Sequence, residues 1–124
     1  MNIAVVGSRN WPDPKFVYQR LKEAALEAQA IEEPLRIVSG GARGVDTMAA
    51  NWARAASVDL VEYPADWQRY GRSAGYRRNN DIVNAADIVI AFQIGGSKGT
   101  QHSIDLARQQ GKPVAVYTER DLSA

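Results

Sequence analysis

Short apolar runs alternate along the whole chain with longer segments of helical periodicity. Mainly apolar runs occupy residues 3–6, 35–38, 60–63, 88–92 and 113–117, and glycine or proline follows or precedes each of them closely. Runs of this length and type are typical of strands that are buried on both faces. The pattern therefore predicts five strands.

In the segments between these runs, apolar residues recur every three or four positions. Such spacing gives a helix one apolar face, which packs on a sheet. The clearest example is 45–56, and its large apolar face favours self-association. Helices are predicted from residue 13 to about 28, over 45–56, up to about 86 and from 100 to 110, with Gly111 as the last C-cap. The residues from Thr118 onward are predicted to have no regular structure.

The order of these elements is β-α-β-α-β-α-β-α-β, which is typical of a parallel sheet covered by helices on both faces. We therefore predict the α/β class, as a small Rossmann-like, three-layer domain. Its five-stranded parallel sheet is predicted to have the order 3-2-1-4-5. At 124 residues the chain is expected to form a single domain, residues 1–124.

Composition excludes several classes of protein. Fifteen Lys and Arg against fourteen Asp and Glu give a net charge of +1, so a strongly basic nucleic-acid binder is disfavoured. There is no cysteine and a single histidine, His102, so no metal site is predicted. No apolar run approaches a membrane span, and no signal peptide precedes the first strand. We expect a cytoplasmic protein without a membrane partner.

Three polar or glycine-rich turns follow predicted strands, at 7–11, 39–44 and 95–100. In parallel sheets ligands bind beyond the carboxyl ends of the strands, near the point where the strand order reverses. Glycine lets backbone amides approach an anion, and the helix that follows directs its positive end to the same place. Glycines after a strand can simply allow a tight turn. Two such turns that also carry cations and hydroxyls instead favour a binding site for a phosphate-bearing ligand. The predicted ligand-binding residues are Gly7, Ser8, Arg9, Trp11, Ser39, Gly40, Gly41, Arg43, Gly44, Asp46, Trp67, Arg78, Asn79, Gly95, Gly96, Ser97, Lys98, Gly99 and Thr100.

Several of these positions have two interpretations. The segment 66–79 contains four arginines and three aromatic residues, which either bind a nucleobase and phosphate or cover the sheet and meet solvent. Asp46 either binds ribose hydroxyls or complements a helix N-terminus. His102 is either structural or catalytic. Neither the dinucleotide-binding fingerprint nor the P-loop pattern is present.

Taken together, the motifs at 7–9, 39–46, 66–67, 74–79 and 95–100 resemble the YspA-like branch of the SLOG superfamily. The resemblance covers nearly the whole chain. It implies a Rossmann-like fold that binds nucleotides or nucleotide-derived ligands, in a branch common in phages and mobile elements. Relatives in the superfamily include LOG-type phosphoribohydrolases and Smf-type DNA-processing proteins.

The resemblance to LOG-type enzymes breaks at one position that matters for catalysis. Arg78 matches the arginine that those enzymes use beside the phosphoribosyl group, and 95–100 matches their phosphate turn. Their catalytic glutamate, however, corresponds to Ser103 here. A serine supplies neither the charge nor the basicity that cleavage of an N-glycosidic bond needs. The remaining candidates for catalysis are Asp46, Asp66 and Arg78.

Three functions follow from these residues. The first is binding or sensing of a nucleotide, such as an ADP-ribose-like ligand or a nucleoside monophosphate, with or without an accompanying Mg²⁺. The second is a nucleotide N-glycosidase, or phosphoribohydrolase, whose carboxylate has moved. The third is binding of single-stranded nucleic acid. No cofactor is predicted with certainty, and a homo-oligomer is expected.

Overall fold

The predicted sheet is present in the computed structural model, which describes residues 1–123. Five parallel strands are ordered β3-β2-β1-β4-β5. The order reverses between β1 and β4, which places the switch point at the centre of the sheet. The strands are β1 (Asn2–Gly7), β2 (Arg36–Ser39), β3 (Asp59–Glu62), β4 (Ile88–Gln93) and β5 (Val114–Thr118).

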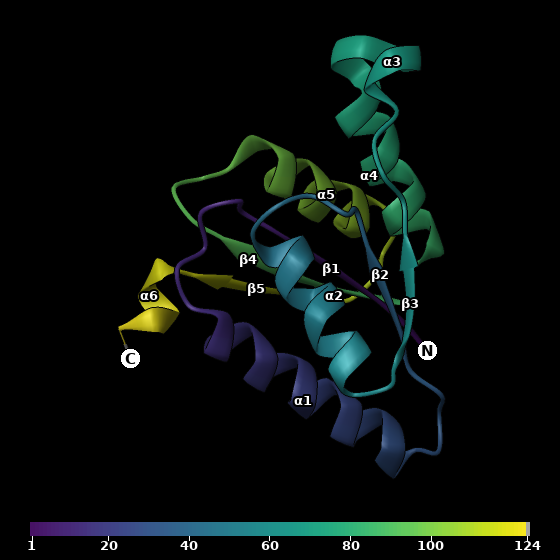
Figure 1. Cartoon of the computed structure of the whole chain (residues 1–124), viewed down its shortest axis with the longest axis vertical. Coiled ribbons are helices and arrows are strands. Elements are labelled where there is room, and N and C mark those ends of the chain that lie inside the picture. Colours follow the sequence, from purple (N-terminus) through teal and green to yellow (C-terminus); the bar gives the residue numbers. More distant parts are fainter. Residues whose placement is uncertain (124) are drawn as a thin grey trace.

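Helices cover both faces of this sheet, as the apolar stripes predicted. Figure 1 shows α1 and α2 on one side of the strands and α4 and α5 on the other. The helices are α1 (Pro14–Ala30), α2 (Val45–Ala55), α3 (Trp67–Tyr70), α4 (Ala74–Ala85), α5 (Lys98–Gln109) and α6 (Glu119–Leu122), with a 3-10 turn, η1 (Gly71–Ser73), between α3 and α4.

The central strand shows how the chain divides its core into two layers. Side chains of a strand alternate between the two faces. Ile3 and Val5 of β1 therefore pack in the cluster under α1 and α2. Ala4 and Val6 pack in the cluster under α4 and α5. The four side chains are almost wholly buried, so the runs of apolar residues mark strands that contact helices on both sides.

Two expectations from the sequence are corrected. The residues after Thr118 form a short helix, α6, because the Thr118 and Asp121 side chains make a reciprocal capping box at its start. The apolar face of α2, with Val45, Ala49 and Ala53, is buried inside the molecule. That face is therefore no argument for self-association. No helix in residues 1–123 has the length and apolar content to cross a membrane.

The segment from α3 to the start of α4 differs from the rest of the fold. Figure 1 shows α3 standing away from the body of the molecule, beyond the end of α4. Neither α3 nor η1 contains a buried residue. The segment is ordered by its own contacts: Asp66 caps α3 by accepting from the Arg69 amide, and Arg77 lies over the Tyr70 ring at 4.3 Å. We refer to residues 67–73 as the projecting arm.

Candidate ligand-binding site

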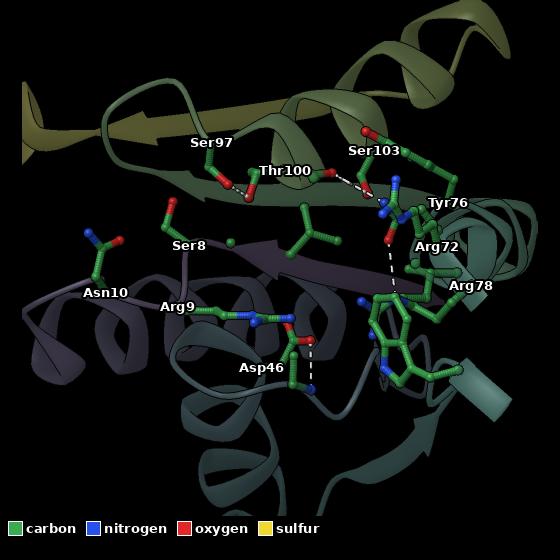
Figure 2. A pocket seen from close by; sticks show the side chains of 18 residues that line it. Ser8, Arg9, Asn10, Asp46, Arg72, Tyr76, Arg78, Ser97, Thr100 and Ser103 are labelled. Atoms are coloured by element: carbon green, nitrogen blue, oxygen red, sulfur yellow. Dashed lines mark hydrogen bonds between the residues drawn. The ribbon is translucent and has the colours of Figure 1, made fainter. Parts of the chain in front are cut away.

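A pocket of about 490 Å³ lies beyond the carboxyl end of β1, at the switch point of the sheet. This is where ligands bind in open parallel sheets, and the volume is in the range of small-molecule sites. Residues from β1 and the turn after it, from the β2–α2 turn, from the projecting arm, from α4 and from α5 surround it (Figure 2). Its lining residues are Val6, Gly7, Ser8, Arg9, Asn10, Ala42, Asp46, Trp67, Arg72, Gly75, Tyr76, Arg78, Asn79, Ile82, Ser97, Gly99, Thr100 and Ser103.

The first turn of α5 forms one side of the pocket. Ser97 is the N-cap but its side chain does not cap the helix amides; its Oγ lies 3.2 Å from Thr100 Oγ1. The buried Gln93 side chain fixes this turn by donating to the Ser97 carbonyl oxygen at 3.2 Å. An uncapped helix N-terminus carries about half a positive charge and unpaired amides. This side of the pocket is therefore suited to an anion.

The opposite side is occupied by a carboxylate of the protein. Asp46, in the first turn of α2, is only 8% exposed, and its Oδ2 accepts the Ala42 amide at 3.1 Å. Burial raises the pKa of Asp46 above its ordinary value of 3.8, while the Ala42 hydrogen bond and the charge of Arg78 act to lower it. Figure 2 shows Asp46 and Arg9 on one side of the pocket and Ser97, Thr100 and Ser103 on the other.

Arg78 connects the two sides through a chain of hydrogen bonds. Its Nη1 donates to the Gly40 carbonyl oxygen at 2.8 Å, and its Nε donates to Asn79 Oδ1 at 3.2 Å. The Asn79 amide in turn donates to the Gly99 carbonyl oxygen and to His102 Nδ1, each at 3.2 Å. A Cβ at position 40 would lie 2.9 Å from both Arg78 Cζ and Asp46 Oδ2, so a larger residue there would displace these two side chains. The guanidinium is thus fixed at the edge of the pocket.

The projecting arm and α4 supply the aromatic residues. Trp67 and Tyr76 are half exposed, at 53% and 50%, and both line the pocket. The Trp67 ring lies against the first turn of α4 at Gly75, where an added Cβ would sit 3.4 Å from it. Arg72 of η1 reaches the same end of the pocket, beside Tyr76 and Arg78 in Figure 2. Exposed aromatic rings of this kind offer surfaces on which a planar ligand can stack.

The ionisable side chains give the pocket a positive charge. Arg9, Arg72 and Arg78 line it against the one carboxylate of Asp46. Their charges exceed that of the carboxylate, although the whole chain has a net charge of only +1. Within residues 1–123, no three His, Asp or Glu side chains come close enough together to hold a metal ion.

The structure brings about half of the predicted ligand-binding residues together. The predicted residues that line the pocket are Gly7, Ser8, Arg9, Asp46, Trp67, Arg78, Asn79, Ser97, Gly99 and Thr100. They come from the end of β1 and the turn after it, from the first turns of α2 and α5, and from α3 and α4. The turns after β1 and β4 meet because these two strands are neighbours. Those that do not line it are Trp11, Ser39, Gly40, Gly41, Arg43, Gly44, Gly95, Gly96 and Lys98.

The turn after β2 does not form the second phosphate site that its glycines predicted. Asp46 accepts the Ala42 amide, so a carboxylate stands where an anion was expected. Arg43 is exposed and does not line the pocket. Gly41 and Gly44 have φ of +72° and +78°, and the Gly44 backbone lies against that of Arg9. These glycines allow the turn to pack closely, and the turn itself contributes only Ala42 to the pocket lining.

Five further residues predicted to take part in binding or catalysis lie outside this pocket. Trp11 is 3% exposed and packs against Phe16 and Phe92, so it cannot stack on a ligand. Ser39 is fully buried and lies at 3.5 Å from both the Gly41 amide and the Asp46 carbonyl. Asp66 caps α3 outside the pocket, and the exposed Gly95 and Gly96 have positive φ and also lie outside it.

Sequence reasoning missed Arg72 and Tyr76 as individual lining residues. The arginine-rich and aromatic segment containing them was recognised, but a helical segment places only some of its side chains on one face. Asn10, Gly75 and Ser103 were also missed as lining residues. Ser103, the position at which LOG-type enzymes carry their glutamate, is buried on the pocket side of α5. No signal in the sequence distinguished Arg43, which does not line the pocket, from Arg72, which does.

The fold is that of a Rossmann-like domain with a pocket at its switch point, and comparison with known proteins identifies its family. The chain belongs to the YspA, cpYpsA-related SLOG family, whose model matches residues 1–70. It is similar to the Gene 61 protein of Mycobacterium phage D29, with 35% identity over 124 residues, 95% of this chain and 97% of that protein.

Two solved structures share the fold. DNA processing protein A from Helicobacter pylori, described for its single-stranded DNA binding mode, aligns with a TM-score of 0.64 and 23% identity. The alignment covers 94% of this chain and 64% of that one. DNA processing protein A (DprA) from Streptococcus pneumoniae aligns with a TM-score of 0.54 and 22% identity, over 98% of this chain and 60% of that one. The chain thus spans less than two thirds of the length of each.

Proposed function

We propose that this protein binds a nucleotide or a nucleotide-derived ligand in the pocket at the switch point. The observation that carries the proposal is the convergence of an uncapped helix N-terminus, three arginines and two exposed aromatic rings on one pocket. A nucleotide has the three matching parts: a phosphate for the α5 amides, a base for the Trp67 and Tyr76 rings and a ribose between them. Membership of the SLOG family supports this assignment.

The proposal gives Arg9, Arg72 and Asp46 each a role. The phosphate binds at the first turn of α5, between Ser97, Gly99 and Thr100, and Arg9 and Arg72 neutralise its charge. Asp46 accepts hydrogen bonds from ribose hydroxyls, because its carboxylate is the only one that lines the pocket in the described part of the chain. A carboxylate beside a phosphate site repels a simple anion, so this pocket favours a ligand that carries donors next to its phosphate.

Titration calorimetry with the four ribonucleoside 5′-monophosphates and ADP-ribose tests the proposal. At least one should bind, and Arg9→Ala and Arg72→Ala should each weaken it roughly ten- to hundred-fold, since a hydrogen bond to a charged group contributes about 1.5–3 kcal/mol. Arg43→Ala is the matched control, because it removes an exposed arginine outside the pocket. The proposal would be overturned if none of these compounds bound, or if Arg43→Ala and Arg72→Ala changed the affinity equally.

Binding of single-stranded nucleic acid is the wider form of the same proposal. It is supported by the four arginines and three aromatic residues of segment 66–79 and by the shared fold with DNA processing protein A from Helicobacter pylori. Phosphate contacts make such binding steeply dependent on salt. In a gel-shift series with a labelled single strand, the logarithm of the affinity should then fall linearly with the logarithm of the salt concentration. An affinity that does not change with salt counts against nucleic-acid binding.

A second candidate function, cleavage of the N-glycosidic bond, is favoured by the position of Asp46. Its carboxylate lines the pocket across from Ser103, whereas Asp66 caps α3 outside. In this reaction Asp46 accepts a proton from a water molecule that attacks the anomeric carbon. The bond from that carbon to the base breaks, and the base leaves with the electron pair and takes up a proton.

Chromatography of free base released from nucleoside monophosphates tests this candidate. The candidate is supported if the wild type releases free base, the Asp46→Asn variant releases none and the Asp66→Asn variant releases as much as the wild type. If no base is released, or both variants release it equally well, this mechanism is excluded and binding alone remains.

A further inference from the structure

A second hollow, of about 580 Å³, lies on the other side of the first two turns of α5. Ser97, Gly99, Thr100 and Ser103 of this helix face the pocket described above. The residues that alternate with them, Lys98, Gln101, His102 and Asp105, line the second hollow together with Gly96 and Tyr76. Tyr76 lines both hollows.

The hydrogen-bond pattern determines which group His102 offers to this hollow. The Asn79 amide is oriented because its Oδ1 accepts from Arg78 and its Nδ2 donates to the Gly99 carbonyl oxygen. The same Nδ2 lies 3.2 Å from His102 Nδ1, which must therefore accept. A neutral imidazole that accepts at Nδ1 carries its hydrogen on Nε2. The Tyr76 ring, edge-on to His102 at 4.6 Å, holds this orientation.

The second hollow thus presents two donors, the His102 Nε2–H and the Lys98 ammonium. Lys98 is exposed. The carboxylate of Asp105 is engaged by the Gln101 side-chain amide, which donates to its Oδ1 at 2.9 Å. A cation and a neutral donor beside an exposed aromatic ring match the chemistry of a phosphate with an attached base.

We propose that the natural ligand contains two nucleotide units joined by a phosphodiester, one in each cavity, with the Tyr76 ring between them. The inference rests on the proposed binding function, because the first unit is the nucleotide of the pocket. The linking phosphate contacts Lys98 and His102. Lys98 and Gly99 are consecutive residues, about 1.5 Å apart along the helix axis, and they line different hollows, so a single phosphodiester link is long enough to join the two sites.

Calorimetry with adenosine 5′-monophosphate and the linear 5′-phosphorylated dinucleotide pApA tests the inference. The dinucleotide should bind at least ten-fold more tightly than the mononucleotide. Lys98→Ala should remove this advantage and leave the affinity for the mononucleotide unchanged. Arg108→Ala, which removes an exposed cation from the last turn of the same helix, is the matched control and should change neither affinity.

The outcomes separate the inference from the function on which it rests. If neither compound binds the wild type, the nucleotide-binding proposal fails together with the inference. If the mononucleotide binds and the dinucleotide is no tighter, or if Lys98→Ala weakens both equally, only the two-unit ligand is overturned. A ten-nucleotide single strand distinguishes the two sources of such a ligand: equal affinity to pApA identifies a free dinucleotide, and tighter binding identifies the end of a strand.

Discussion

Asp46 is the residue on which the chemistry of the pocket depends most. It is a buried carboxylate with one amide donor and a nearby guanidinium, in a place where the sequence predicted room for an anion. A group of this kind costs stability unless its charge is fully compensated. Proteins retain such groups where ligands bind or reactions occur. Asp46 is buried from bulk solvent but lines the pocket, and this position supports a role in ligand recognition.

The pH dependence of stability tests this account of Asp46. Burial raises its pKa in the folded state above the ordinary 3.8, so the wild type loses stability as pH rises from that value through the folded-state pKa. Asn at this position stays neutral, so the stability of Asp46→Asn relative to the wild type should increase over that interval and then level off. Urea unfolding of both proteins between about pH 3.5 and pH 7 measures it. Parallel stability curves would contradict the assigned cause.

At the residue scale, sequence reasoning located turns better than side-chain directions. The predicted residues Ser97, Gly99 and Thr100 do line the pocket, because a helix N-terminus after a central strand must face the carboxyl edge of the sheet. It failed for Trp11 and Arg43, since the directions of loop side chains depend on tertiary packing. Trp11 packs against Phe92, a residue more than eighty positions away along the chain. No local pattern carries that information.

At the scale of elements, the periodicity of apolar residues predicted every strand and the four long helices. Periodicity works here because the central strands β1 and β4 are buried on both faces and each long helix on one. It did not predict the projecting arm or α6, which bury no residue and depend on capping by Asp66 and Thr118. Short helices without a buried face leave little apolar signal.

Gly7 lies where β1 contacts β4 and α2, so a substitution there tests how closely these elements pack. A Cβ there would lie 2.7 Å from the Phe92 carbonyl oxygen of β4 and from Val45 Cβ of α2. Gly7→Ala should therefore destabilise the fold by about 1–3 kcal/mol, as overpacking does. Gly99→Ala is the comparison, because no atom lies within 4 Å of its added Cβ. Denaturant unfolding measures both, and equal stability of Gly7→Ala and the wild type would show that β1 can move away.

The projecting arm should be the first part of the fold to open. It buries no residue, whereas the helices on the sheet contribute to the core. Local opening exposes the backbone to proteases. Limited trypsin digestion followed by mass spectrometry should therefore find early cleavage after Arg69 or Arg72. Cleavage after Arg54 or Arg108, exposed residues in α2 and α5, should come later. The reverse order would show that the arm is as stable as the body.

At the scale of the whole molecule, charge is distributed unevenly. Residues 67–78 contain four arginines and no Asp or Glu, while the complete chain has a net charge of +1. The fold places this segment beside the carboxyl edge of the sheet, where the first turn of α5 adds its dipole. A nearly neutral protein thus acquires a local positive field at its pocket, which attracts anionic ligands without a high overall charge.

A ligand that binds in this positively charged pocket should raise the melting temperature, Tm, of the protein. A ligand at one hundred times its Kd adds roughly 2.7 kcal/mol to the free energy of unfolding, which in a domain of this size corresponds to about 5–15 °C in Tm. Differential scanning fluorimetry with a nucleoside monophosphate that binds in calorimetry should show such a rise for the wild type and for Arg43→Ala. Arg72→Ala, tested at the same concentration, should show a clearly smaller rise, because part of the field that holds the phosphate is lost. An identical rise in Arg72→Ala would place the ligand outside the pocket, even if its binding were tight.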